Sequence, residues 1–493
     1  MKFAHIALAV LLAGVWSIQS VSAQTPKGRN GNSERFVHDE ILIKFSPGAL
    51  SVRAGNSLRS NGADVVETLG RQGWRRVKIP PGLTPEKAMR RFEKLEGVEA
   101  VQPNYYYNLL VEPNDPQFNT SGLWGLAKIS APAAWDLSTG SQTVVVANID
   151  TGIRYTHEDL AANMWTNPGE INSNGVDDDG NGFVDDYYGY DFFYNDSDPM
   201  DVNGHGTHTA GTIGARGNNG LGVVGVNWNV RIMAVKIYSP DGRDTTSAML
   251  INAYNYVRMM KERGVNIRVT NNSYGGCLEA CGYDQATKDA IDALGDAGIL
   301  NVFAAGNSHT DNDVIPHYPS NYTSPSILAV AASTKNNDEC CTYNFGPTSV
   351  DIAAPGVGIL STYSSSNNSY ALLSGTSMAT PHVTGAAALL SAYRPELSVA
   401  SLKATLMNSV DVLPSYAERV KSGGRLNVAN ALQNPTVCTF SLSQSDIFVQ
   451  TKGGHYSVSV SAPQNCDYSV RSSDHWIFVY GDDARSGNGT IEF

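Results

Sequence analysis

The middle of the chain alternates between short apolar runs and longer segments whose apolar residues recur at helical spacing. Apolar runs bounded by polar residues predict buried strands, and longer small-residue or amphipathic runs predict helices. The predicted strands are Val144–Ile149, Arg231–Ile237, Ile267–Asn271, Ile299–Ala304 and Ile327–Ala331. The predicted helices are Gly206–Gly214, Ser247–Arg263, Ala286–Asp296, Met378–Tyr393 and Ser398–Asn408. This alternation predicts an α/β fold with a central parallel sheet covered by helices on both faces.

The pattern is different near the start of the chain. After a polar, glycine-rich stretch at 24–36, three strands are predicted at 40–45, 73–80 and 97–105. Thr84-Pro85-Glu86 opens a helix with a cap, a first-position proline and an early acid. Residues 24–113 therefore form a small α+β unit, which ends in a linker with Pro113 and Pro116.

The pattern changes again after Asn434-Pro435. Short alternating strands separated by turns predict a small β-sandwich over residues 434–493. The predicted strands are 438–442, 447–449, 455–460, 466–470 and 476–479. The sequence stops at Thr490-Ile491-Glu492-Phe493, in the middle of a further apparent strand, so we expect this unit to be incomplete.

Residues 1–23 have the features of a secretory signal peptide. Lys2 supplies a positive start, Ile6–Val15 an apolar core, and Val21-Ser22-Ala23 a small-residue cleavage site. A buried N-terminal helix is the alternative, but the run lacks a polar face. No later run is long enough for a transmembrane helix, so we expect a secreted, extracellular protein without a membrane span.

Charge and cysteine content agree with secretion. The chain carries a net charge of −12, although residues 24–113 are mildly basic, so the remainder is acidic and nucleic acid is not an expected partner. The 6 cysteines suit an oxidising compartment. Sequence alone does not fix their connectivity; Cys277–Cys281 and Cys438–Cys466 are our preferred pairs, and a bridge between adjacent Cys340 and Cys341 is disfavoured by strain.

Three stretches carry the residues of a nucleophile, a base and an orienting acid. An apolar strand ends in Asp150, and His205 stands among glycines ahead of a small-residue helix. Ser377 follows Gly375 at the first turn of another helix, where unpaired N–H groups and the positive dipole end gather. Ser377 taken alone could equally be an N-cap. Together, the three residue types suit nucleophilic catalysis.

These three stretches resemble those of the subtilisin-like serine proteases, in the chain order Asp, His, Ser. The resemblance covers residues from about 115 to 432. It implies a three-layer subtilisin-like catalytic domain at 114–433, with Ser377 as nucleophile, His205 as general base and Asp150 as the group that orients the imidazole. The other histidines of these stretches, His208 and His382, are interpreted as structural.

The resemblance extends to the oxyanion hole and the substrate cleft. Phe303-Ala304-Ala305-Gly306-Asn307-Ser308 matches the family's oxyanion stretch, so Asn307 would donate its side-chain amide, beside the backbone N–H of Ser377. Asn after Gly is also common in turns. The expected cleft residues, which bind an extended peptide, are Ser273, Tyr274, Gly275, Gly242, Ala304 and Gly306. Ser308 stands where relatives specific for basic residues tend to have an acid, so a broad or apolar preference is expected.

Two structural calcium sites are expected. The loop with Asp177, Asp179, Asn181 and Asp185 has alternating oxygen ligands and a turn glycine, but carries Tyr188 where a bidentate acid is usual. Asp186 or Asp191 could compensate, and a solvated acidic insertion is the alternative. The family's common calcium site is matched by Asp159, Asn219, Leu221 and Val223, the last two through carbonyl oxygens.

The flanking units also resemble known types. Residues 24–113 resemble the inhibitory propeptides of these proteases, which would make the leader a partner of its own catalytic domain, cut between about 107 and 117; a permanent N-terminal domain is the alternative. Residues 434–493 resemble a BACON domain, which implies glycan binding, with a mere spacer as the alternative. The resulting hypotheses are a secreted serine endopeptidase made as a zymogen, acting on protein or peptide substrates, and a pseudoprotease or adhesin that displays the last domain.

Overall fold

The computed structural model describes residues 6–7, 36–46, 52–105, 111–276, 283–336, 343–450, 452–481 and 484–493. The chain divides into two compact units, one of residues 20–110 and the other of residues 1–19 and 111–493. Apart from Ile6–Ala7, the predicted signal peptide lies outside the described residues, as do Cys277, Cys281, Cys340 and Cys341.

The larger unit is built on a 9-stranded sheet in the order β15-β16-β12-β11-β10-β9-β6-β8-β7. All neighbours pair in parallel except β15 and β16, which are antiparallel. The strands are β6 Gly140–Asp150, β7 Gly189–Asp191, β8 Asn229–Lys236, β9 Ile267–Asn272, β10 Leu300–Ala304, β11 Ile327–Ser333, β12 Ile352–Pro355, β15 Asp411–Val412 and β16 Gly424–Arg425. The five predicted strands are thus confirmed, and most of their ends fall within two residues of the predicted ones.

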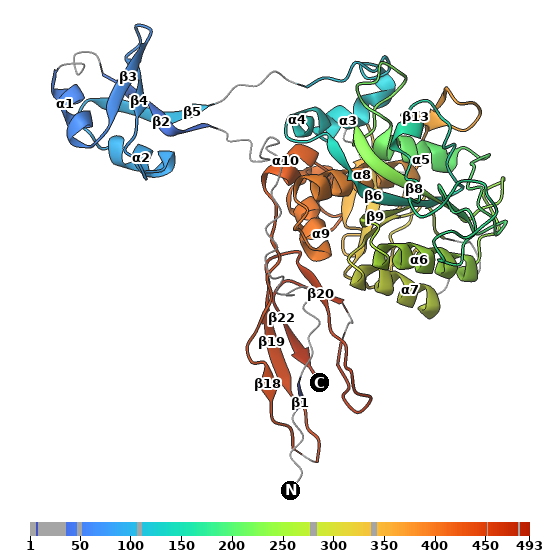
Figure 1. Cartoon of the computed structure of the whole chain (residues 1–493). Helices are drawn as coiled ribbons and strands as arrows, with labels where there is room; N and C mark the ends of the chain where they lie inside the picture. Colours follow the sequence, from blue (N-terminus) through green and yellow to red (C-terminus); the bar gives the residue numbers. More distant parts are fainter. Residues whose placement is uncertain are drawn as a thin grey trace. The chain divides into compact units, whose positions relative to one another are not determined.

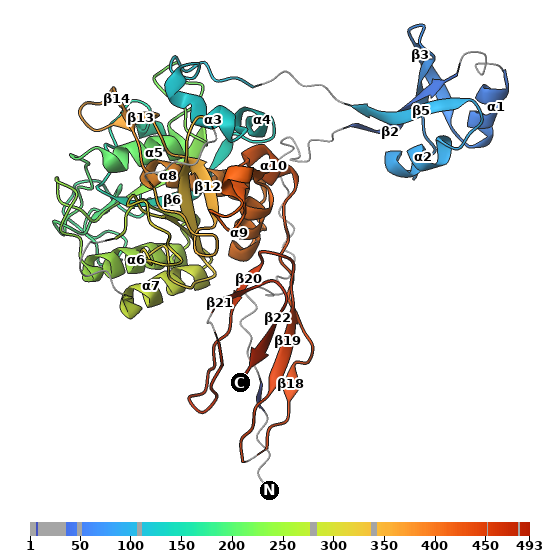
Figure 2. The same cartoon turned by 180° about the vertical axis from the view of Figure 1, so that it is seen from behind.

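Helices cover both faces of this sheet, which confirms the predicted three-layer α/β fold (Figure 1). Helices α5 (His205–Gly214) and α8 (Thr376–Tyr393) pack on the face of β6 that carries Val144 and Val146. Helices α6 (Ser247–Glu262) and α7 (Gln285–Asp296) pack on the opposite face, which carries Val145, Ala147 and Ile149. The same two layers are seen from behind in Figure 2.

Shorter elements complete the larger unit. They are η1 Ser121–Leu123, α3 Trp124–Lys128, α4 Ala131–Trp135, η2 Ala161–Asn163, the antiparallel hairpin β13 Ile359–Tyr363 and β14 Ser369–Leu373, α9 Val399–Asn408, η3 Pro414–Tyr416 and α10 Val428–Gln433. No helix in the described part of the chain is both long and apolar enough to span a bilayer.

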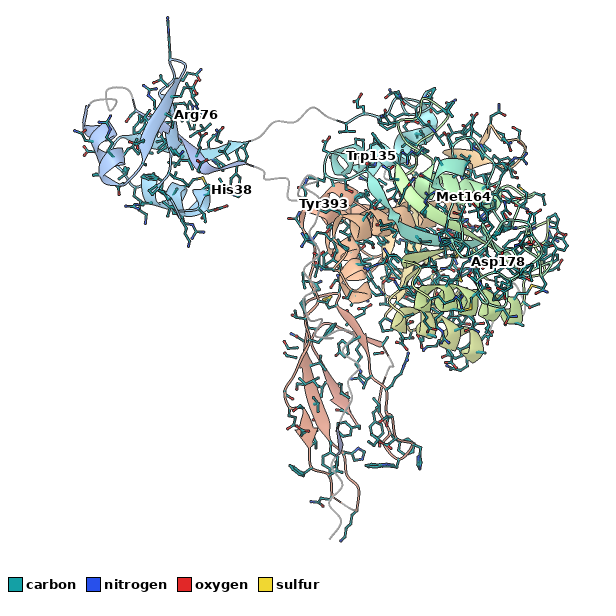
Figure 3. All side chains as sticks on the ribbon, in the orientation of Figure 1. His38, Arg76, Trp135, Met164, Asp178 and Tyr393 are labelled. Carbon is teal, nitrogen blue, oxygen red and sulfur yellow. A yellow bond between two sulfur atoms is a disulfide. The ribbon has the colours of Figure 1, made fainter. Side chains whose placement is uncertain are left out.

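The smaller unit is a 4-stranded antiparallel sheet in the order β3-β4-β2-β5, with two helices. Its elements are β2 Phe36–Phe45, α1 Val52–Ser60, β3 Asp64–Leu69, β4 Trp74–Lys78, α2 Pro85–Phe92 and β5 Val98–Tyr105. Thr84 caps α2 as predicted, whereas α1 and β3 were not predicted. Arg76, labelled in Figure 3, pairs across the sheet with Glu40 at 3.2 Å and Glu67 at 3.1 Å.

The C-terminal segment forms small antiparallel sheets around its own apolar cluster. Its strands are β17 Ser441–Leu442, β18 Asp446–Ile447, β19 Ser457–Ser461, β20 Asp467–Ser469, β21 Ala484–Ser486 and β22 Gly489–Glu492, and β18 also pairs with β1, Ile6–Ala7. The predicted Cys438–Cys466 disulfide is confirmed. The strand predicted at 476–479 is wrong: these residues are not in a sheet, although Ile477 and Val479 still pack on the cluster.

Candidate active site

Asp150 is the last residue of β6, at the carboxyl end of the sheet, where ligand sites of such sheets lie. Its side chain is only 2% exposed. The Oδ1 atom accepts hydrogen bonds from the backbone N–H of Thr151 at 2.8 Å and from His205 Nδ1 at 2.7 Å. An ionised carboxylate only accepts, so the proton of this pair lies on Nδ1 and the neutral imidazole presents an unprotonated Nε2.

Glycines allow His205 to approach Asp150 so closely. His205 is the first residue of α5, and a Cβ on Gly206 would lie 2.1 Å from the Gly152 carbonyl oxygen and 3.1 Å from Asp150 Cβ. Gly204, just before the helix, has φ +108, a conformation that L side chains rarely adopt. The glycine pattern around His205 therefore places the start of the helix against the end of β6.

The pKa of His205 reflects two opposing effects. Burial lowers the pKa, but the charge of Asp150, the hydrogen bond to it and the charge of Asp201 outweigh burial and raise the pKa above its ordinary value. The imidazolium form is therefore stabilised, which is what a base needs once it has accepted a proton.

Asp201 is a site residue that the sequence did not indicate. Its side chain is fully buried, and Oδ1 accepts from Thr151 Oγ1 at 3.0 Å and from the N–H of Gly204 at 2.9 Å. Oδ2 accepts from the N–H and the hydroxyl of Thr207, at 2.9 and 2.6 Å. Asp201 thus fastens the turn before His205 to the residue after Asp150. The only indication in the sequence that Asp201 belongs to the site is its position four residues before His205.

Ser377 is the second residue of α8, so it does not cap this helix; the cap position is Gly375. The Ser377 hydroxyl donates to the Ser273 carbonyl at 2.9 Å, and the Ser273 hydroxyl donates to the Ser377 carbonyl at 2.9 Å. The second bond has a local cause. Pro381, four residues on, has no N–H for the Ser377 carbonyl, which Ser273 supplies instead. No hydrogen bond joins the described side chains of His205 and Ser377.

Asn307 lies beside the start of α8. Its Oδ1 accepts from the N–H of Thr376 at 2.9 Å and from the Thr376 hydroxyl at 3.0 Å. These bonds fix which end of the amide faces α8 and leave the Nδ2 donor available on an exposed side chain. An available donor next to Ser377, at the N-terminal end of a helix, suits a developing negative charge.

The remaining histidines of these stretches make structural contacts. His208 Nε2 lies 2.9 Å from the Ile359 carbonyl and 3.1 Å from the Ala371 carbonyl, so this ring ties α5 to the β13–β14 hairpin. His382 Nδ1 lies 2.9 Å from the Met378 carbonyl within α8. Burial lowers the pKa of each ring to about 4, which keeps both neutral near pH 7.

The expected cleft residues fall into three places. Ser273, Tyr274 and Gly275 follow β9, and the Tyr274 hydroxyl is used internally, donating to Asn272 at 2.8 Å. Ala304 ends β10 and is 3% exposed. Gly242 lies in a separate turn, closed by its N–H to the Ser239 carbonyl at 3.0 Å.

An unpredicted ring lies between two of these segments. A Cβ on Gly275 would be 2.6 Å from His317 Cε1, and a Cβ on Gly306 would be 2.7 Å from His317 Cδ2. The half-buried His317 side chain therefore packs against both glycines. His317 lies in a loop without a regular pattern, so its place beside the cleft could not be predicted.

The acidic loop gathers a different set of groups from the one expected. Carboxylate oxygens of Glu170, Asp177 and Asp179 lie within 4.8 Å of one another. Asn181 donates its amide to Asp179 and Asp186, at 3.3 and 3.0 Å. Asp185 instead accepts from the backbone N–H groups of residues 174 and 175, at 2.9 and 2.8 Å. Asp178, labelled in Figure 3, belongs to the same loop but not to the cluster.

The cluster fits a hard cation. Glu170 is 7% exposed, and its Oε2 atom has no hydrogen-bond partner among the described residues. Asp179 Oδ1 is buried without a hydrogen bond from the described part of the chain and has one ion pair, to Arg263 at 3.2 Å. An orphaned buried carboxylate oxygen is costly without a cation, and three carboxylates are ligands that calcium prefers.

The residues of the other expected calcium site are brought together by hydrogen bonds. Asp159 accepts from the Asn219 amide at 2.8 Å and from the N–H of Val223 at 2.8 Å, and the N–H of Leu221 donates to Asn219 at 2.8 Å. Burial raises the pKa of Asp159. The carboxylate is thus surrounded by donors from the loop 217–223.

The chain is similar to known proteins over most of its length. The subtilase family model matches residues 141–462, and a fervidolysin N-terminal prodomain model matches residues 23–104. Thermitase of Thermoactinomyces vulgaris is 35% identical over 321 residues, covering 65% of this chain and 99% of thermitase. A thermophilic serine proteinase of Bacillus sp. (strain AK1) is 31% identical over 377 residues, covering 76% of this chain and 83% of that protein. An extracellular protease of Xanthomonas campestris pv. campestris is 30% identical over 438 residues, covering 82% and 74%.

A sheet with a carboxylate–imidazole pair at its carboxyl edge and a serine at a helix start has the arrangement of serine hydrolases of α/β architecture. The chain belongs to the subtilase family. It is a subtilisin-like serine endopeptidase with a prodomain, as the resemblance implied.

Proposed function

We propose that Asp150, His205 and Ser377 form the catalytic triad. The observation that carries this is the 2.7 Å bond between His205 Nδ1 and the buried Asp150 carboxylate, which leaves Nε2 as the base. Ser377 turns its hydroxyl from the Ser273 carbonyl to Nε2 when substrate binds, and His205 takes the proton as Oγ attacks the scissile carbonyl. His205 then gives that proton to the leaving amine, and water repeats the sequence on the acyl-enzyme.

Asn307 Nδ2 and the backbone N–H of Ser377 stabilise the oxyanion of each tetrahedral intermediate. The support is the orientation of the Asn307 amide, whose oxygen is held by Thr376 at 2.9 Å, so that its nitrogen is left to donate elsewhere. Substrate binds as an added extended strand between the segment 273–275 and the turn at Gly242, with Ala304 and Gly306 lining the pocket for the residue before the cut. We expect broad or apolar preference there.

The enzyme is made as a secreted zymogen, with residues 1–23 as signal peptide, 24–113 as inhibitory propeptide, 114–433 as catalytic domain and 434–493 as a BACON-like module. The test is autoprocessing of purified chain. The wild type should lose its leader by a cut between about residues 107 and 117, and Ser377→Ala should stay full length. Identical electrophoretic migration of the wild type and Ser377→Ala would instead support the hypothesis of a pseudoprotease or adhesin.

Calcium is the proposed structural cofactor, held by Asp177 and Asp179 with the unpredicted Glu170. When bound, it would neutralise three neighbouring carboxylates and so stabilise the loop. Asn181 and Asp185 support this cluster through their hydrogen bonds to Asp179 and to the adjoining turn. Asp159, with Asn219, Leu221 and Val223, is proposed as the second site on the family resemblance alone, since hydrogen bonds already occupy both Asp159 carboxylate oxygens and the Asn219 side-chain oxygen.

The C-terminal module is proposed to bind glycans. Along 476–480, Ile477 and Val479 face the apolar cluster, whereas Trp476, Phe478 and Tyr480 are exposed by 51%, 71% and 48%. Three exposed aromatic rings within five residues offer apolar surface with polar edges. Calorimetric titration of the full chain with mucin-type glycans should show binding that Trp476→Ala and Phe478→Ala each weaken. Equal heats of binding for the wild type and both variants would favour the alternative that residues 434–493 are only a spacer.

A further inference from the structure

A buried amide interrupts the apolar face of β6. Val144, Val146, Asn148 and Asp150 point to the layer formed by α5 and α8, and Asn148 is fully buried. Burying an amide is unfavourable unless it is hydrogen-bonded, and this one uses both ends. Its Nδ2 donates to the Gly206 carbonyl at 3.1 Å, and its Oδ1 accepts from Asn271 Nδ2 at 3.0 Å.

The Thr209 hydroxyl lies within hydrogen-bond distance of Asn148 and of the Gly206 carbonyl to which Asn148 donates. This hydroxyl has one hydrogen and three acceptors in reach: the Gly206 carbonyl at 3.0 Å, Asn148 Oδ1 at 3.2 Å and Asp150 Oδ2 at 3.2 Å. The first two acceptors already receive amide hydrogens from Asn148 and Asn271. Asp150 Oδ2 is the charged acceptor, and hydrogen bonds to charged groups are the stronger ones.

The same amides extend to the serine helix. Asn271 Nδ2 also donates to Ser273 Oγ at 3.0 Å, and Ser273 Oγ donates to the Ser377 carbonyl at 2.9 Å. Asn271 Oδ1 accepts from the α8 residue Thr384 at 3.0 Å. One connected set of buried side chains therefore links the elements that carry Asp150, His205 and Ser377.

We propose that Asn148 is a positioning residue: it occupies the competing partners of the Thr209 hydroxyl, so that this hydroxyl donates to Asp150 Oδ2. The inference rests on the proposed triad. Asn148 touches neither substrate nor the His205 side chain. Without it, the Gly206 carbonyl loses a donor and Thr209 turns toward that carbonyl. Asp150 then has one donor fewer, and its charge attracts the His205 imidazolium more strongly.

The test is the acid limb of the pH profile of kcat/KM, measured on one peptide substrate. Asn148→Val and Thr209→Val should each move the midpoint upward by about half a pH unit, as expected for loss of one hydrogen bond to a carboxylate. The double variant should move no further than Thr209→Val, because Asn148 acts through that hydroxyl. Thr209→Ser keeps the hydroxyl and should restore the wild-type midpoint.

The matched control is Thr212→Val, which removes a hydroxyl from the same helix that donates to the His208 carbonyl, at 3.3 Å, and not to Asp150. Its midpoint should equal that of wild type. A midpoint does not depend on how much of a variant folds, so reduced yield leaves the test valid. Unmoved midpoints in Asn148→Val, or additive shifts in the double variant, overturn the inference. An inactive wild type would instead overturn the proposed triad.

Discussion

The end of β6 and the acidic loop 167–191 are both rich in carboxylates, but the carboxylate oxygens of the two regions differ in their hydrogen-bond donors. At the end of β6, both buried acids are satisfied within the protein: Asp150 by Thr151 and His205, and Asp201 by the turn before His205. In the loop, buried oxygens of Glu170 and Asp179 have no hydrogen-bond donor from the residues that the structure describes. The first region is organised by its own side chains, and the second has the features of a site completed by a cation. Variants should therefore change turnover in the first region and stability in the second.

The largest effect is expected from Asp150→Asn. The amide would favour the wrong tautomer of His205 and could not stabilise its positive form. The value of kcat should fall about 10⁴-fold, while the melting temperature changes little. Steady-state kinetics and a melting curve on the same preparation check both parts. A large loss of stability with normal turnover in the remaining folded protein would remove the contrast between the two regions.

Asn307→Ala should have the next largest effect. Loss of the side-chain donor acts on the transition state, so kcat should fall about 10²–10³-fold with KM nearly unchanged, which is the loss known for removal of the equivalent donor in subtilisin. The matched control is Asn368→Ala, the same change at an exposed asparagine outside the proposed machinery. Equal kinetics of the two variants would show that Asn307 is only a turn residue.

Chelation of calcium should lower the melting temperature but leave the pH midpoint of kcat/KM in place. At a calcium concentration about 100 times Kd, the bound ion contributes about 2.7 kcal/mol to stability. Glu170→Gln should reduce the difference between calcium-loaded and chelated protein, whereas Asp178→Asn, a loop acid outside the cluster, should preserve it. A melting temperature that chelator does not move would contradict both proposed sites.

The smallest effect is expected on pH dependence. The pKa of His205 lies above its ordinary value, so kcat/KM should fall as pH drops through a midpoint above about 6.5. Asp201→Asn removes a negative charge that contributes to this rise and should lower the midpoint by about half a unit. Asp198→Asn, which makes the same charge change at a more exposed residue, should not move it. A midpoint that rises in Asp201→Asn would contradict the prediction that the Asp201 charge raises the pKa of His205.

What could be predicted correctly from the sequence depends on local periodicity. The core strands and helices are mostly apolar or built of small residues, so β6, α5 and α8 could be placed to within a few residues, and with them Asp150 and His205 at the same edge of the sheet. The bonded pair Cys438 and Cys466 was also found. Segment 476–479 has strand-like alternation because it packs one face on the C-terminal core, but none of the described strands pairs with it.

What could not be predicted depends on contacts between distant segments. Glu170 joins Asp177 and Asp179 only because the loop folds back, and Asp185 turns away to bind backbone N–H groups instead. The Ser377 carbonyl finds Ser273, which is 104 residues away in the chain. Residue type shows that such groups are polar, but their partners are set by packing.

The most direct measurement of the central claim is labelling with an active-site-directed phosphonate, followed by peptide mapping of the mature enzyme. A serine activated by His205 should give one adduct, on Ser377, formed in parallel with loss of activity, and His205→Ala, whose leader is first removed by a trace of added wild-type enzyme, should leave the same peptide unmodified. An adduct on another residue, or equal labelling of Ser377 with and without His205, would contradict the proposed triad.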